Sequence, residues 1–395
     1  FWLKPSDSSQ AVGERGIIGG KSCGQQWKMP PNIGAIMANS SVVPVEPRTD
    51  SPYGGMQLSL QDASLETRIK LTRPPDTDNE LIKVAALYGP PGILAVMRSR
   101  TDYGWFVVLC LRAVEMCIGP RTGKLQILEA CDPVAFSMQM LEMEMIDEIF
   151  QLMKDYAHVR DVLKSGLSII EILIMYDTDW RDEVARKGGA TLLCNILKQR
   201  SDSPSLVVQV LACMAYLAAE DYIEVMLCQH DALEHVVFVL REYVRNTEIA
   251  LRGCLTLVNL TVCEPHIEEL MEKDGVLPML QVFDTHWNNP DVIMAVCGVL
   301  ANFSVKLEVQ YLLASEGLFP RVGSAMLLDR DNAALQVACL KALVNYSASP
   351  EFYMQMEQEG IPRLVGQAMV DHAEDAAVQR YGNYFLGQHF SCHIL

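Results

Sequence analysis

The chain has 395 residues, half of them hydrophobic, and a formal net charge of −17 at pH 7. An acidic surface repels phosphate backbones and anionic lipid headgroups, so we expect neither nucleic acid nor an anionic membrane as a partner. No run of about eighteen apolar residues occurs, so we expect no transmembrane segment. The length allows one long solenoid or two to three compact domains.

The twelve cysteines are placed like small hydrophobic residues. Most lie inside apolar helical runs, such as those around Cys213 and Cys339. There is no CxxC pair and no Cys/His cluster with zinc spacing, so we expect no metal and no cofactor. The pattern favours an intracellular, reducing compartment. The cytoplasm and the cilium both fit, and the mitochondrion is an alternative because the chain begins at Phe1 and not at Met.

Residues 1–78 are predicted to form an extended N-terminal arm. The segment is rich in Pro, Gly and Ser, and includes the pairs Pro30–Pro31 and Pro74–Pro75. Such a composition cannot bury enough apolar surface to order itself. Two placements are open for the arm, on its own solenoid or on a neighbouring subunit, and we favour the neighbouring subunit.

From residue 79 onward, apolar-periodic segments alternate with short breaks, which is typical of helices. Residues 79–133 are interpreted as a diverged first repeat followed by an insertion. Its turn is placed at Gly92-Ile93-Leu94 and its last helix at Trp105 to Ile118.

Residues 134–395 repeat themselves. Similar apolar segments end in Asn259-Leu260-Thr261, Asn302-Phe303-Ser304 and Asn345-Tyr346-Ser347, two successive steps of 43 residues. Tyr216 lies one further step upstream. A fixed period of this length indicates a stack of repeated supersecondary units.

A second marker has the same period. A polar-to-apolar break precedes a core helix in each unit, at Gly188, Asp231, Gly275, Gly317 and Gly360. Two markers in one register over about two hundred residues make a chance match implausible.

Each unit is predicted to contain three helices. In one unit, an acidic helix over Pro265–Asp274 precedes a glycine turn, a second helix over Val276–Phe283, and a third over Pro290–Phe303 that begins after an Asn or Asp. The third helix is nearly uncharged, as a helix packed between neighbours should be. One unit cannot bury these faces alone, so the units must stack.

These motifs resemble the armadillo-repeat family, whose third helix ends in a Leu-x-Asn-Leu-Ser-like motif and whose second helix opens with Gly-x-Leu-Pro. Gly275-Val276-Leu277-Pro278 and Gly317-Leu318-Phe319-Pro320 match the latter motif. The resemblance is strong over 177–390 and weaker over 134–176. It implies an all-α, right-handed α-solenoid of about seven armadillo-type repeats, preceded by the extended arm.

The resemblance also implies candidate partner-binding residues. In armadillo proteins that grip extended peptides, such an asparagine lies on the concave face, so Asn259, Asn302 and Asn345, with Tyr216, are candidate groove residues. An asparagine can hold a peptide amide because its side chain both donates and accepts hydrogen bonds. The alternative is structural, in which each asparagine bonds a neighbouring helix.

One departure from the family concerns nuclear-import receptors, which pair this asparagine with a tryptophan one turn earlier. The equivalent positions here are Leu255, Gly298 and Lys341. We therefore do not expect this chain to recognise a nuclear-localisation peptide.

No catalytic motif is present, and we name no catalytic residue. The sequence has no phosphate loop, no GxSxG elbow and no HExxH helix. His230 and His235 lie five residues apart, which is poor spacing for a shared metal. We therefore expect a protein without enzymatic activity.

Three functions remain open at this point. The first is a scaffold inside a multi-subunit assembly, with the arm contacting other proteins. The second is a mobile adaptor that holds an extended peptide in the concave groove. The third is a regulator of a small GTPase or a chaperone.

Overall fold

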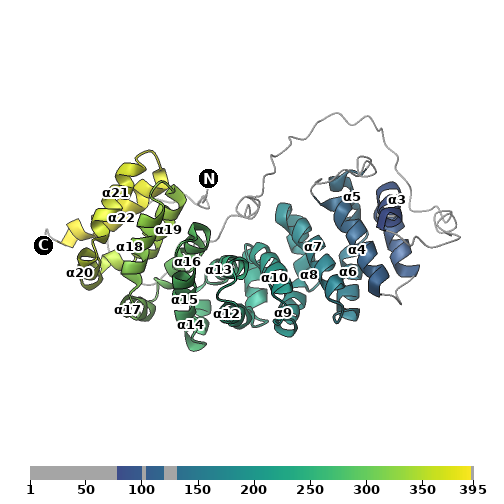
Figure 1. Ribbon diagram of the computed structural model, residues 1–395, viewed down its shortest axis with the longest axis horizontal. Coiled ribbons are helices and arrows are strands. Elements are labelled where there is room, and N and C mark those ends of the chain that lie inside the picture. Colours follow the sequence, from purple (N-terminus) through teal and green to yellow (C-terminus); the bar gives the residue numbers. More distant parts are fainter. Residues whose placement is uncertain (1–77, 100–103, 120–130, 393–395) are drawn as a thin grey trace. The chain divides into compact units, whose positions relative to one another are not determined.

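The computed structural model describes residues 78–99, 104–119 and 131–392 (Figure 1). They form twenty α-helices, α3 to α22, and one short 3-10 turn, with no β-strand in these ranges. None of the described helices is long and apolar enough to cross a membrane. The helices form two compact units that meet in the chain between Gly189 and Ala190.

The N-terminal unit holds the first six helices. They are α3 (Asp78–Ser99), α4 (Gly104–Ile118), α5 (Pro133–Glu142), α6 (Met145–Asp155), α7 (Arg160–Tyr176) and α8 (Thr178–Arg186). Helix α3 consists of two helical segments joined at Gly89, which has a φ of +64° and is followed by two prolines. Counting these segments separately, the chain up to α7 contains two triplets of helices.

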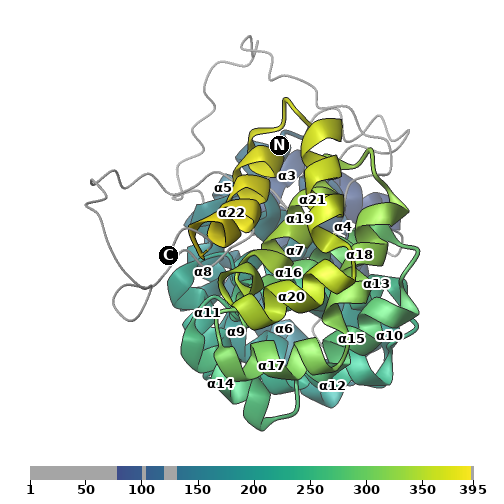
Figure 2. The same ribbon diagram turned by 90° about the vertical axis from the view of Figure 1, so that its left-hand side faces the viewer.

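The third triplet begins with α8 in the N-terminal unit, so the C-terminal unit begins with the second helix of that triplet. Its helices are α9 (Gly189–Gln199), α10 (Pro204–Leu217), α11 (Asp221–Cys228), α12 (Ala232–Glu242), α13 (Thr247–Leu260), α14 (Glu264–Glu272), α15 (Leu277–Thr285), α16 (Pro290–Phe303), α17 (Leu307–Ser315), α18 (Leu318–Leu328), α19 (Ala333–Val344), α20 (Pro350–Gln358), α21 (Ile361–Asp371) and α22 (Ala376–Cys392). Figure 2 shows the last triplet, α20 to α22, nearest the viewer. In chain order the described helices therefore make seven triplets, the number of repeats that the sequence predicts.

A left-handed residue separates the first helix from the second in every triplet. The residues with positive φ are Gly89, Glu144, Gly188, Asp231, Asp274, Gly317 and Gly360. The last five follow one another at uniform steps of 43 residues. Glycine accepts this conformation without strain, and aspartate tolerates it better than most residues.

The structure corrects two of the turns predicted from sequence. The left-handed residue of the fifth triplet is Asp274, with a φ of +54°, and not Gly275. Position 274 keeps the 43-residue step. In the first triplet the break is at Gly89, whereas Gly92 lies inside the second segment of α3. Pro90 and Pro91 explain this shift, since proline is accepted in the first turn of a helix.

The third helices begin at polar caps with the same period. Asn246, Asn289, Asn332 and Asp375 each accept a hydrogen bond from a backbone N–H in the first turn that follows. Such caps satisfy donors that have no partner inside the helix. This confirms the predicted Asn or Asp before the third helices of the last four repeats, whereas α7 and α10 begin without such a cap.

The third helices form the core of the stack. Within the C-terminal unit α10 packs on α13, α13 on α16, α16 on α19 and α19 on α22 (Figure 1). In the N-terminal unit α4 packs on α7. Helix α16 explains this packing, because almost all its side chains after Asp291 are apolar and most are buried. Burial against both neighbours removes this surface from water.

Some sequence-based predictions concern residues that the structure does not describe. The N-terminal arm, apart from its last residue, and most of the insertion before α5 lie outside the described ranges. The domain boundaries 1–78, 79–133 and 134–395 therefore stay predictions.

Two glycines of the last triplet provide a test of the left-handed turn. A Cβ added at Gly360 or at Gly366 meets no atom within 4 Å, but only Gly360 has a positive φ, of +71°. We expect Gly360→Ala to lower the free energy of unfolding by about 1 kcal/mol. Gly366→Ala, inside α21, should raise it by about 0.5–1 kcal/mol, because glycine is a poor helix former.

Urea unfolding of the full chain, followed by circular dichroism, measures both effects. Equal shifts of the two variants in the same direction would contradict the role of the left-handed turn.

Candidate functional site

The predicted asparagines lie at equivalent ends of successive third helices. Asn259 is in α13, Asn302 in α16, and Asn345 caps the end of α19. Tyr216 holds the corresponding place in α10 and is buried. The stacking of the third helices therefore brings these residues into one row.

Each asparagine donates a hydrogen bond to the preceding repeat. Asn259 Nδ2 lies 2.9 Å from the carbonyl oxygen of Ala215, and Asn302 Nδ2 lies 2.9 Å from that of Val258. Asn259 and Asn302 are 0% and 1% exposed, so both serve the packing between helices. Asn345 is exposed and is the member of the row that solvent reaches.

Thr261 and Ser304, each two residues after an asparagine, take part in the same set of hydrogen bonds, which we call the asparagine ladder. Asn302 Nδ2 donates to Thr261 Oγ1 at 3.1 Å, and Asn345 Nδ2 donates to Ser304 Oγ at 2.8 Å. Each hydroxyl then donates to a carbonyl of its own helix, as Thr261 does to Leu257 at 2.7 Å. The asparagine of one repeat thus bonds the hydroxyl of the repeat before it. The sequence shows the Asn-x-Ser/Thr motif, but it does not show that the asparagine bonds the hydroxyl of the preceding repeat.

A cleft between α9 and α12 was not predicted from the sequence. It has a volume of about 510 Å³, and we call it the α9–α12 cleft. It is lined by Leu197, Lys198, Ser201, Glu234, His235, Val237, Phe238, Arg241 and Lys273. These residues come from the second helices of two successive repeats and from the end of α14, so only stacking brings them together.

Charge in the α9–α12 cleft is mainly positive. Lys273 Nζ lies 2.9 Å from Glu234 Oε2, and this bond lowers the pKa of Glu234 and keeps its carboxyl ionised. Burial and the charge of Lys198 lower the pKa of His235, which favours the neutral imidazole. Lys198 and Arg241 are both exposed. Phe238, which is 52% exposed, adds an aromatic surface.

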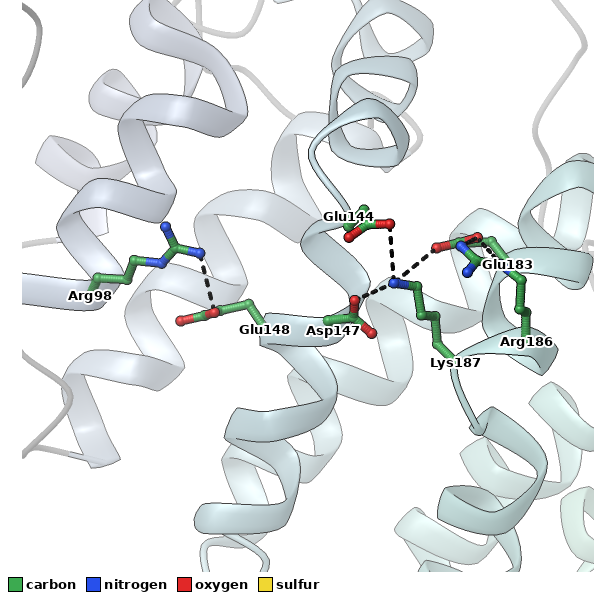
Figure 3. Close-up of polar contacts among 7 residues, drawn as sticks. All are labelled: Arg98, Glu144, Asp147, Glu148, Glu183, Arg186 and Lys187. Carbon is green, nitrogen blue, oxygen red and sulfur yellow. Dashed lines mark hydrogen bonds and ion pairs between the residues drawn. The ribbon is translucent and has the colours of Figure 1, made fainter. Parts of the chain in front are cut away.

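In the N-terminal unit, Lys187 joins α8 to α6 (Figure 3). Its ammonium forms a salt bridge with Asp147, lies 3.4 Å from Glu144 and lies 3.9 Å from Glu183. The hydrogen bond with Asp147 is the main cause that raises the pKa of Lys187. The side chain of Lys187 is only 12% exposed, so the three carboxylates surround a largely covered cation.

This contact recurs in the C-terminal unit. Lys187 immediately precedes the left-handed residue Gly188, and its partner Asp147 lies in the first turn of the preceding second helix. Lys273 bonds Glu234 in the same way, and His230 Nε2 lies 2.8 Å from Thr191 Oγ1. Polar contacts at this position therefore fix successive repeats, which is a structural role.

Comparisons with known proteins agree with this architecture. The family model described as LRRK2 ARM repeat matches residues 195–388. A designed armadillo repeat protein in complex with the peptide (KR)4 has a TM-score of 0.52 and 15% identity, over 62% of this chain and 98% of that chain. A computationally designed armadillo repeat protein for modular peptide recognition has a TM-score of 0.53 and 17% identity, over 62% and 99%.

A chain from a structure of the cadherin and beta-catenin interaction has a TM-score of 0.58 and 14% identity, over 80% of this chain and 70% of that chain. A search of curated sequences finds no matching relative. The described helices therefore form an armadillo-repeat solenoid, and residues 195–388 match an armadillo-repeat family model. The armadillo fold is typical of protein-interaction scaffolds and typically carries no enzymatic activity.

The positions where armadillo import receptors carry tryptophans are filled differently here. Leu255 is buried and Gly298 lies close to Val258 of the preceding third helix. Lys341 is 8% exposed, and its Nζ lies 5.3 Å from the ring centre of Tyr381. Burial and the nearby charge of Arg380 lower the pKa of Lys341 to about 7. These positions thus serve the packing of the third helices.

The structural role of the asparagine ladder can be tested with two matched variants. Asn302→Ala should lower the free energy of unfolding by about 1–3 kcal/mol, because buried partners lose their hydrogen bonds. Asn345→Ala removes an exposed side chain and should cost less than about 1 kcal/mol. Chemical unfolding of both variants measures the difference. If Asn345→Ala proves the more damaging change, the ladder does not stabilise the stack as described.

Lys341 predicts a pH dependence of stability. Between about pH 7 and pH 10 the unfolded chain retains a proton on Lys341 that the folded chain loses, so this residue makes stability rise with pH. Lys341→Met should therefore be more stable than the wild type near pH 7 by a few kcal/mol, at about 1.4 kcal/mol per unit of pKa shift.

The advantage of Lys341→Met should shrink toward pH 10. Thermal unfolding at a series of pH values, with the wild type as reference, follows this difference. A constant difference across the series would show that Lys341 keeps its proton in the folded protein.

Proposed function

We propose that this chain is a non-enzymatic protein-interaction scaffold and a built-in subunit of a larger assembly. The observation that carries the proposal is the α9–α12 cleft. We further propose that the cleft holds an acidic segment of a partner that carries an apolar side chain.

The charge of the cleft supports an acidic partner. The chain as a whole has a net charge of −17, yet the cleft is lined by three cationic side chains and a single carboxylate. That carboxylate, on Glu234, is already paired with Lys273. Lys198 and Arg241 therefore give the cleft a positive local potential, which attracts carboxylates and suppresses binding of basic segments.

The apolar part of the cleft supports a partner side chain in contact with Phe238. The ring is 52% exposed, while Leu197 and Val237, which also line the cleft, are buried. Covering an exposed phenylalanine removes apolar area from water and contributes about 1–2 kcal/mol. Aromatic residues in such positions are frequent binding hot spots.

The known structures support the class of partner through the fold they share with this chain. One designed armadillo repeat protein is in complex with a peptide. That peptide is basic, whereas the cleft described here is lined by cations. We therefore take from the relative only the ability of stacked repeats to hold an extended segment.

The alternative of a mobile adaptor that uses the asparagine row has less support. Asn259 and Asn302 are buried between third helices, and the described structure presents only Asn345 of the three to solvent. A built-in subunit and an adaptor also differ in stoichiometry, which an experiment can measure. The contact between the N-terminal arm and other proteins stays part of the proposal.

The test is affinity purification of the full chain from cells, followed by zero-length cross-linking of amines to carboxylates. We expect partners at fixed stoichiometry, with Lys198 linked to Asp or Glu residues of a partner. The double variant Lys198→Glu and Phe238→Ala should lose about 90% or more of this recovery, since each change removes about 1 kcal/mol or more of binding energy.

Trp287→Ala is the matched control, because Trp287 is 64% exposed and lies outside the cleft. It should leave recovery unchanged. Equal recovery by the double variant and the wild type would overturn the assignment of the cleft. Partners recovered only in substoichiometric amounts would replace the subunit proposal with a mobile adaptor.

A further inference from the structure

Three side chains with metal-binding atoms converge between the fourth and fifth repeats. Glu224 comes from α11, Cys263 is the residue directly before α14, and His266 lies in the first turn of α14. One carboxylate oxygen, the thiol sulfur and one imidazole nitrogen all lie within 4.8 Å of one another. We propose that Glu224, Cys263 and His266 form a zinc-binding site that joins these two repeats.

The local structure explains why these atoms meet. Cys263 and His266 are three residues apart at the start of a helix, which places them on one side. Glu224 faces them from the first helix of the preceding repeat, where its carboxylate accepts a 3.0 Å contact from His266 Nδ1. The sequence gives no sign of this set, since 39 residues separate Glu224 from Cys263.

Burial of Glu224 favours a cation at this position. Its side chain is 1% exposed, and a carboxylate removed from water is stabilised by nearby positive charge. Zn²⁺ would place two positive charges beside this carboxylate. On binding zinc, His266 would exchange its contacts with Glu224 and with the carbonyl of Leu260, 3.0 Å away, for a bond to the metal.

The donor set fits zinc better than magnesium or calcium. Sulfur, imidazole nitrogen and carboxylate oxygen are the three ligand types that zinc uses, whereas the harder ions prefer oxygen alone. Atoms bound to one tetrahedral zinc lie on the order of 3.5 Å apart, so the three side chains must move together by about 1 Å. A water molecule would complete the fourth position.

Two further features support binding. Cys263 precedes the first turn of α14, where the partial positive charge of the helix terminus stabilises a thiolate. Cys263 and His266 are both partly exposed, which leaves the ion a route to the buried carboxylate. A zinc ion held by two repeats would stabilise their interface, because metal-binding free energy adds to the stability of the folded state.

The test uses the full chain after removal of metals by a chelator. Titration with Co²⁺ should give one equivalent of binding with a near-ultraviolet absorption band from thiolate-to-cobalt charge transfer, and Zn²⁺ should displace it. Zn²⁺ should also raise the melting temperature. Cys263→Ser and His266→Gln should each weaken zinc binding by about 100-fold or more, since each removes a direct ligand.

His372→Gln is the matched control, because His372 lies at the end of α21, in another repeat, and is not one of the three ligands. It should leave zinc affinity unchanged. Zinc should also protect Cys263 of the wild type from alkylation, measured by mass spectrometry, which needs no variant to fold. Absence of the thiolate band, equal zinc affinity in Cys263→Ser, or alkylation of Cys263 unchanged by zinc would each overturn the proposal.

Discussion

The packing of each third helix on the next is the interaction on which the rest of the structure depends. Helices α10, α13 and α16 are apolar on nearly every side, so none of them could remain in water alone. From Gly188 onward the left-handed residue recurs every 43 residues, which brings the chain back in the same register in each of the later repeats. Polar contacts between repeats then recur at similar offsets, as in the asparagine ladder, where Asn259 and Asn302 each bond a carbonyl 44 residues earlier.

The sequence predicts the features that repeat and misses those that do not. The three-helix units, the caps such as Asn289 and the apolar third helices all follow from periodicity, and the structure confirms them. The turn at Gly89 was missed because two prolines override the pattern seen in later repeats. The sequence predicts Gly275 in place of Asp274 because glycine adopts the left-handed conformation more readily than aspartate.

The candidate sites were harder to predict for a physical reason. The α9–α12 cleft combines residues from three repeats and the Glu224–Cys263–His266 group from two, so their members are separated by tens of residues. No short sequence motif contains residues that lie so far apart in the chain. The asparagines were visible because they recur, and recurrence in a solenoid indicates contact between neighbours at least as strongly as contact with a partner. A position that breaks the period, such as Phe238, is therefore the better guide to function.

The asparagine ladder also bears on the chemistry that the chain can undergo while it folds. Asn259-Leu260-Thr261, Asn302-Phe303-Ser304 and Asn345-Tyr346-Ser347 all have the form of an acceptor for N-linked oligosaccharide. An oligosaccharide on Asn259 or Asn302 would occupy the place of the neighbouring helix, since these side chains are 0% and 1% exposed. Glycosylation of Asn259 or Asn302 and the stacking of the repeats are therefore mutually exclusive, and these two residues would prevent assembly of the solenoid if they were modified first.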